Sequence, residues 1–195
     1  MQTVNSMHSP ASRSRWFDGC GNGKIHDMKK TLEVLNRLVA EKVIKDYAIG
    51  GAMGAVWYME AISTMDLDVF VLFTDETSLD PISPIYKCLK ELGYEADPEQ
   101  KECINIEGVP VQFLPVYNEL LKDAMKNAKG FDYEGLPTKV LSAEHLAAIC
   151  VDTNRMKDKL RVEMFLRSPK FDKERFGAIL SQNKLEGRFA AWNLI

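Results

Sequence analysis

The chain has 195 residues, of which 46% are hydrophobic and 27% are charged, and its formal net charge is -3. These values predict one globular domain with its own core and give no global argument for nucleic-acid binding. Four cysteines without Cys-x-x-Cys spacing and three histidines predict neither a zinc site nor a disulfide framework, which favours a reducing, cytoplasmic location. No segment is apolar over the length of a transmembrane helix, so no membrane partner is expected.

The first elements follow from composition and periodicity. Residues 1–26 are rich in Ser, Gly, Asn and Arg without periodicity, which predicts a disordered leader. Apolar residues at helical spacing from Met28 to Val39 predict a helix of about four turns. A strand over 47–49 then ends in Gly50-Gly51, and a short helix to about Met59 follows.

The second half of the core is predicted in the same way. Residues 67–73 form an apolar strand, and Pro81 and Pro84 open a helix that stops at Gly93. A hairpin is expected over 103–106 and 109–114, with Glu107-Gly108 as its tight turn.

The remainder of the chain is expected to be helical. Beyond Pro115 we predict helices, with Ser142 capping one of them. The fold class is therefore α/β (α+β), with a core over 27–140 and a C-terminal helical segment over 141–195. Residues 155–175 hold eight Lys/Arg against four Asp/Glu, so this part is locally basic.

Asp66 and Asp68 are the strongest candidates for a functional site. Alternate strand residues project to one face, so the two carboxylates can converge on one cation while Leu67 and Val69 face the core. Carboxylate oxygens suit Mg²⁺, which completes its octahedron with substrate phosphates and water.

Gly50 and Gly51 give a complementary candidate for phosphate binding. A strand that ends in two glycines lets backbone approach a phosphate closely, and the helix that follows presents its N-H groups. Ser63 and Thr64 can add hydroxyl donors. Two rival motifs are absent from the sequence: Ile49 stands where a dinucleotide fingerprint needs glycine, and no Gly-Lys-Ser/Thr follows the turn.

In their order and spacing, these motifs resemble those of the DNA polymerase beta-type nucleotidyltransferase superfamily. The matching residues are Ile49-Gly50-Gly51, Ser63-Thr64, Asp66-Leu67-Asp68, Leu146-Ala147-Ala148-Ile149 and Arg155-Met156-Lys157-Asp158. The chain most resembles the small prokaryotic branch that includes the type IV toxin-antitoxin nucleotidyltransferases. The resemblance implies that Arg155 and Lys157 contact the nucleotide.

Two positions depart from the pattern of that superfamily. The resemblance implies a third catalytic carboxylate where this chain has Gln112, and a neutral amide is a poor base and a poor metal ligand. Glu107 in the adjacent turn is the alternative source of that carboxylate. Cys150 stands where the relatives often carry a lysine, which leaves Lys157 for the triphosphate.

Two functions remain open at this stage. One is an enzyme that uses Asp66, Asp68 and position 112 to transfer a nucleotidyl group from an NTP, with Mg²⁺, to a hydroxyl of a protein, a tRNA or a small molecule. The other is a degenerate relative that binds a nucleotide, RNA or a protein partner without turnover. Gln112 is the feature that discriminates between them.

Overall fold

The computed structural model describes residues 28–59, 66–75, 78–100 and 102–194. The expected disordered leader and the expected donors Ser63 and Thr64 lie outside these residues. The helices are α1 (Met28–Ala40), α2 (Gly51–Ala55), α3 (Ser83–Glu91), α4 (Glu119–Lys126), α5 (Ala143–Thr153), α6 (Met156–Arg167), α7 (Lys173–Gln182) and α8 (Glu186–Ala190). The strands are β1 (Asp46–Ile49), β2 (Leu67–Leu72), β3 (Glu95–Ala96), β4 (Ile104–Ile106), β5 (Val109–Pro115), β6 (Lys129–Tyr133) and β7 (Leu136–Val140).

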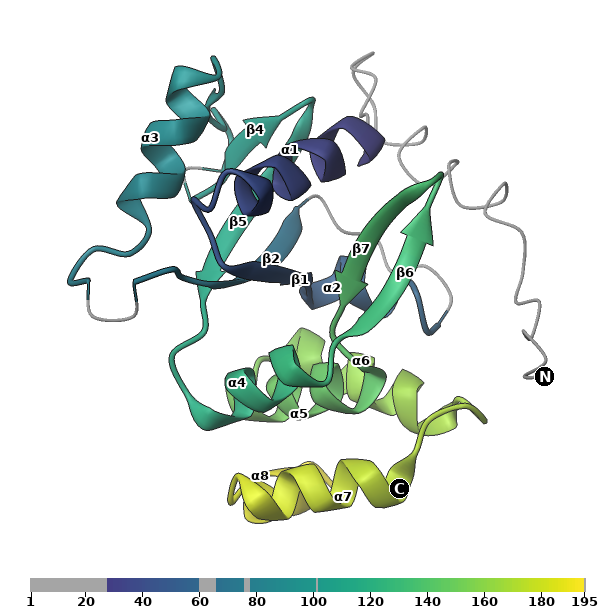
Figure 1. The fold of residues 1–195 in the computed structure, drawn as a ribbon. Coiled ribbons are helices and arrows are strands. Elements are labelled where there is room, and N and C mark those ends of the chain that lie inside the picture. Colours follow the sequence, from purple (N-terminus) through teal and green to yellow (C-terminus); the bar gives the residue numbers. More distant parts are fainter. Residues whose placement is uncertain (1–27, 60–65, 76–77, 101, 195) are drawn as a thin grey trace, which may run out of the picture.

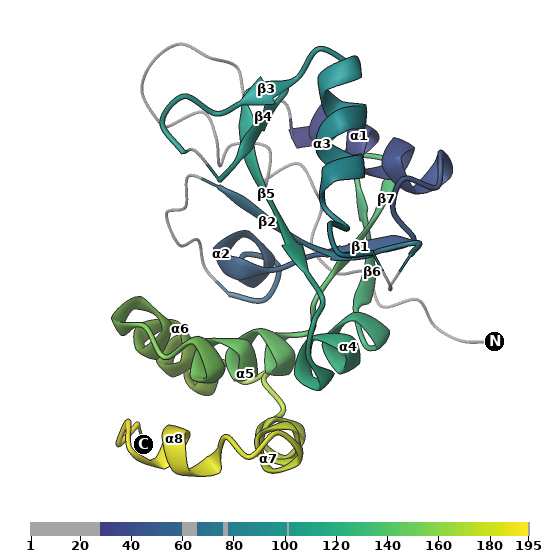
Figure 2. The ribbon, with the colours of Figure 1, turned by 90° about the vertical axis from the view of Figure 1, so that its left-hand side faces the viewer.

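A mixed sheet of seven strands forms the centre, in the order β3-β4-β5-β2-β1-β7-β6. Helices α1 and α3 lie on one side of it, while α4, α5 and α6 lie on the other and α7 and α8 form a further layer (Figures 1 and 2). This arrangement confirms the predicted α/β class with flanking helices and a helical C-terminal segment. Of the described helices, none is long and apolar enough to cross a membrane.

The central strands bury side chains on both faces. Leu67, Val69 and Val71 of β2 are fully buried in the cluster beneath α1 and α3, as the alternation predicts. Phe70 points to the opposite face and packs in the cluster formed with the C-terminal helices. Both faces are therefore covered, and a polar side chain on either face of β2 is bounded by protein.

The expectation that the chain is wholly helical beyond Pro115 is wrong. After α4, strands β6 and β7 form an antiparallel hairpin, and β7 pairs in parallel with β1 through Ile49 and Val140. The turn is Glu134-Gly135, with φ of 52° and 86°, which repeats the geometry of Glu107-Gly108 at 54° and 87°. Both dipeptides have the positive φ angles that a two-residue hairpin turn requires.

The C-terminal helices pack through a continuous row of aromatic rings. Phe165, Phe171, Phe176, Phe189 and Trp192 form successive ring pairs with centroids 5.2 to 6.4 Å apart. Phe171, Phe176 and Trp192 are all buried. Offset and edge-to-face ring pairs add to the energy of area burial, so the row fixes α7 and α8 onto α5 and α6.

Candidate functional site

The glycine pair and Asp68 lie side by side across two antiparallel strands. β1 pairs with β2 so that Ile49 is opposite Val69, and the backbone N-H of Gly50 donates to the carbonyl oxygen of Asp68 over 2.9 Å. The structure therefore brings together two predicted parts of the site that are separated by 16 residues in the sequence.

Gly51 is required by its closeness to the Asp68 carboxylate. Its φ is +56°, and a Cβ placed there would lie 1.6 Å from Oδ2 of Asp68. A Cβ at Gly50 would lie 2.3 Å from a ring carbon of Phe70. Only glycine fits at either position. The structure therefore uses Gly51 to bring the backbone close to Asp68, whereas the sequence predicted a close approach to a phosphate.

The helix after the glycine pair is shorter than predicted and offers little to an anion. α2 has only five residues, and the N-H of Gly50 is already used by the sheet. A helix this short carries little of the dipole of a longer one. Binding of an anion at this site therefore depends on side chains from elsewhere.

Burial is the main reason why the pKa of Asp68 is raised to about 6, and the neighbouring Asp66 carboxylate adds to the shift. Arg155, Arg161 and Lys157 oppose it by favouring the charged form. A carboxylate held among apolar residues and beside a like charge is destabilised, and a bound cation removes that cost.

Gln112 lies on the strand beside Asp68. β5 pairs in parallel with β2, and the two residues are direct partners in the register. The Gln112 amide donates from Nε2 to Oε2 of Glu102 over 2.9 Å. Glu102 comes from the loop before β4, so the structure adds a carboxylate beside Gln112 that the sequence analysis did not identify.

The loop before β4 is organised around Asp97. Asp97 is buried and accepts hydrogen bonds from the backbone N-H groups of Glu99 and Gln100 and from the side chain of Asn105. The signal that could have located Glu102 is the antiparallel pairing of β4 with β5, which carries the start of β4 toward the middle of β5.

Glu107 is held elsewhere. Its carboxylate accepts a hydrogen bond from the Tyr94 hydroxyl over 2.9 Å. Tyr94 packs against the cluster beneath α1 and α3, on the face opposite Asp68. The structure therefore does not bring Glu107 to the candidate site, and the proposal that it replaces the missing carboxylate is not supported.

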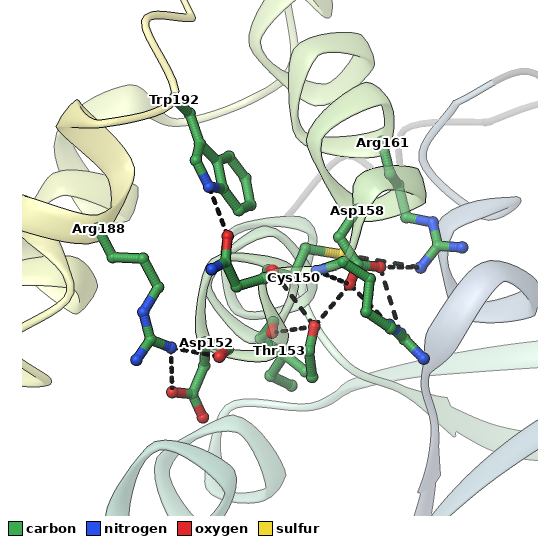
Figure 3. A network of polar contacts seen from close by, with 10 residues as sticks. Cys150, Asp152, Thr153, Asp158, Arg161, Arg188 and Trp192 are labelled. Atoms are coloured by element: carbon green, nitrogen blue, oxygen red, sulfur yellow. Dashed lines mark hydrogen bonds and ion pairs between the residues drawn. The ribbon is translucent and has the colours of Figure 1, made fainter.

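The Arg-x-Lys-Asp segment forms a compact junction between α5 and α6. Asn154 ends α5 with a φ of +55°, and the Asp158 carboxylate accepts a hydrogen bond from the backbone N-H of Arg155 at the start of α6. Asp158 has a fully buried side chain that accepts from Nε and Nη2 of Arg155 and from the Thr153 hydroxyl (Figure 3). Burial alone would favour neutral Asp158, but these hydrogen bonds outweigh it and lower its pKa.

A pocket of about 290 Å³ joins this junction to the sheet. Gly51, Asp68 and Gln112 line one part of it, and Arg155 and Arg161 line another. Lys157 is exposed and is not one of the lining residues. Of the predicted nucleotide contacts, the structure therefore places Gly51 and Arg155 at the pocket, while Arg161 is a lining residue that the sequence analysis missed.

Asp66 and Asp68 have the ligand type that could hold a Mg²⁺ ion together with the phosphates of a substrate. No group of three or more His, Cys, Asp or Glu side chains suited to a metal occurs among the described residues, so a fully protein-made metal cage is not found there. Mg²⁺ commonly uses one or two carboxylates and takes its other ligands from phosphates and water. The raised pKa of Asp68 beside Asp66 agrees with such a two-carboxylate site.

A second polar cluster has the residue types of a hydrolase triad but is structural. His145 contacts the Ser142 hydroxyl and the Asp123 carboxylate, each at 2.9 Å. Both Ser142 and His145 are 1% exposed, and Ser142 caps α5 as predicted. Burial lowers the pKa of His145. Since the hydroxyl cannot reach a substrate, this cluster joins α4 to α5.

Comparison with known proteins gives distant structural similarity. No family model matches the chain, and no curated protein matches it. Similar solved structures include an antigenic nucleotidyltransferase-like protein from Paracoccidioides brasiliensis, with 14% identity, a TM-score of 0.46, and coverage of 85% of this chain and 93% of that chain. ANT(2")-Ia in complex with adenylyl-2"-tobramycin shows 13% identity, a TM-score of 0.46, and coverage of 85% and 97%. At this distance the neighbours identify neither a family nor an activity for this chain.

Proposed function

We propose that the protein binds an NTP together with Mg²⁺ and transfers a nucleotidyl group from it to an acceptor hydroxyl. The observation that carries this proposal is the environment of Asp68. Its carboxylate is packed against Gly51, destabilised by burial and by Asp66, and open to a pocket that two arginines also line. That combination suits a cation and a polyanion bound together.

The residues of the site have separate parts in binding. Asp66 and Asp68 would hold the Mg²⁺, which when bound neutralises phosphate charge and stabilises the charge that develops on the leaving pyrophosphate. Arg155 faces the pocket from the junction of α5 and α6, where Asp158 fixes its guanidinium. Leu146 and Ile149 give another part of the pocket an apolar lining that suits a nucleoside.

The acceptor is left as a class. The resemblance in the sequence admits a hydroxyl of a protein, a tRNA or a small molecule, and a relation to the toxin-antitoxin branch is part of the same proposal. The proposal includes a protein partner, because the sequence resembles that branch.

A second candidate function is nucleotide binding without turnover. Gln112 favours it, because an amide beside Asp68 cannot accept a proton from an attacking hydroxyl. In this case the protein would act as a nucleotide-, RNA- or protein-binding module.

Calorimetric titration with non-hydrolysable α,β-methylene NTPs tests the proposed site. The wild-type protein should bind an analogue in Mg²⁺ and lose that binding in EDTA, because two carboxylates repel a bare triphosphate. Asp66→Asn and Asp68→Asn should each remove the metal-dependent binding while the protein stays folded. Glu99→Gln, at an exposed carboxylate in the β3–β4 loop, is the matched control and should bind normally.

Two results would contradict the assignment. Equal affinity with and without the metal would show that the aspartates do not share a cation with the ligand. Unfolding of either Asn variant would show that the aspartates are structural.

A further inference from the structure

Arg161 is a buried cation with too few partners. Its side chain is 9% exposed and extends from α6 beside Asp158 and Cys150 (Figure 3). Among the described residues, its Nε has no hydrogen-bond partner, and Nη1 donates only to the Cys150 sulfur over 3.7 Å. A guanidinium has five N-H donors, and leaving them unsatisfied in a buried place is costly.

The nearest carboxylate does not compensate Arg161. Asp158 Oδ1 lies 3.6 Å from its Nη1, beyond a good hydrogen bond. The oxygens of Asp158 are already used by Arg155, at 2.8 and 3.2 Å, and by the Thr153 hydroxyl at 2.7 Å. One buried carboxylate is thus shared by two arginines. Arg161 is the more buried of the two and has the weaker contact with it.

We infer that Arg161 is the anchor for an anionic group of the ligand, and that the group is a phosphate of the bound nucleotide. The inference rests on the proposed function. Arg161 lines the same pocket as Asp68 and Gly51, and its charge acts on the Asp68 carboxylate. A phosphate has enough oxygens to bind a cation at Asp68 and the guanidinium of Arg161 in the same pocket together. A single carboxylate group is smaller and has fewer oxygens for both contacts.

The test compares two identical substitutions on one helix. Arg161→Gln should weaken binding of α,β-methylene NTPs in Mg²⁺ by about 10- to 100-fold, the range for losing hydrogen bonds to a charged group. Arg167→Gln is the control, because Arg167 is 77% exposed on α6 and lines a different groove. Its affinity should stay within twofold of wild type. Arg161→Lys should give an intermediate loss, since it keeps the charge but not the planar fork.

The readout also separates an anchor from a structural arginine. If Arg161 serves a ligand, Arg161→Gln should keep the melting temperature of the metal- and ligand-free protein close to that of wild type. The rise in melting temperature that wild type shows with Mg²⁺ and analogue should be lost. If Arg161→Gln does not fold, the melting temperatures of Arg161→Lys with and without Mg²⁺ and analogue are compared with those of wild type instead. Affinity within twofold of wild type in the folded variant would overturn the inference.

A second titration distinguishes failure of this inference from failure of the proposed function. In an Asp66→Asn/Asp68→Asn background the repulsion is removed, so inorganic tripolyphosphate should bind without metal, and Arg161→Gln in that background should abolish the binding. If wild type binds no NTP analogue with Mg²⁺, the proposed function fails. The tripolyphosphate titration then decides by itself whether Arg161 binds a phosphate group. Tripolyphosphate binding that does not depend on Arg161, or no binding at all, would overturn the anchor.

Discussion

Asp68→Asn should stabilise the metal-free protein. The pKa of Asp68 is raised from 3.8 to about 6 in the folded state, chiefly by burial and then by Asp66. The difference is about two pH units, and since each corresponds to about 1.4 kcal/mol, the charged form costs about 3 kcal/mol of folding free energy. Asparagine has nearly the same shape without the charge, so it removes most of that cost.

The effect has a defined dependence on pH. Between pH 3.8 and 6 the folded state binds more protons at Asp68 than the unfolded state, so wild-type stability falls as the pH rises through this window. The advantage of Asp68→Asn should therefore be near zero below pH 4 and reach its full value above about pH 7. This direction is the reverse of that for a carboxylate stabilised by an ion pair.

Urea denaturation in EDTA at pH 4.5 and pH 8 measures this difference directly. Glu99→Gln is the control and should change the free energy of unfolding by less than about 0.5 kcal/mol at either pH. Saturating Mg²⁺ should stabilise wild type more than Asp68→Asn and so reduce the difference between them. A destabilised Asp68→Asn protein at pH 8 would refute the reasoning, because it would mean that the Asp68 charge stabilises the fold.

Further predictions concern the positions that support the site. Gly51→Ala should destabilise the protein and weaken metal binding, because its Cβ collides with Asp68 and φ is positive, whereas the control Gly177→Ala in α7 should stabilise by up to about 1 kcal/mol in the same denaturation assay. Asp158→Asn should cost about 2 kcal/mol of unfolding free energy at pH 7, because it weakens the hydrogen bonds that the buried Asp158 carboxylate accepts from the exposed Arg155 and from Thr153. Gln112→Asp should raise nucleotidyl transfer from labelled NTP by about 10²- to 10⁴-fold if a missing base limits the reaction. Lower transfer by Gln112→Asp would instead show that the hydrogen bond from Gln112 to Glu102 is needed.

Local patterns predicted most of the core because they act over short stretches of chain. The alternation of side chains along β2 correctly predicted that Asp68 lies on the face of the sheet opposite to Leu67 and Val69. The Glu107-Gly108 turn correctly predicted the hairpin of β4 and β5. The hairpin of β6 and β7 was missed although Glu134-Gly135 is the same turn signal. Its first strand, β6, has many exposed residues, and its second strand, β7, pairs with β1, which is distant in the sequence.

The parts of the site that were missed depend on tertiary contacts. Glu102 reaches Gln112 because β4 folds back on β5; the hairpin itself was predicted, but its local pattern does not show that the side chain just before β4 turns toward Gln112. Arg161 is one cation in a basic segment that includes the exposed Lys157, and only the packing of α5 against α6 shows which of them is buried. Charge runs are usually solvated faces, so the sequence alone gives no sign that Arg161 is the buried cation of this segment.

The most direct test of the account is a crystal structure with Mn²⁺ and an α,β-methylene NTP, using the anomalous signal of manganese. We expect a manganese peak bound by the carboxylates of Asp66 and Asp68 and by a phosphate oxygen, with another phosphate oxygen on the guanidinium of Arg161. A nucleotide bound elsewhere, or a manganese ion that has neither aspartate as a ligand, would contradict it.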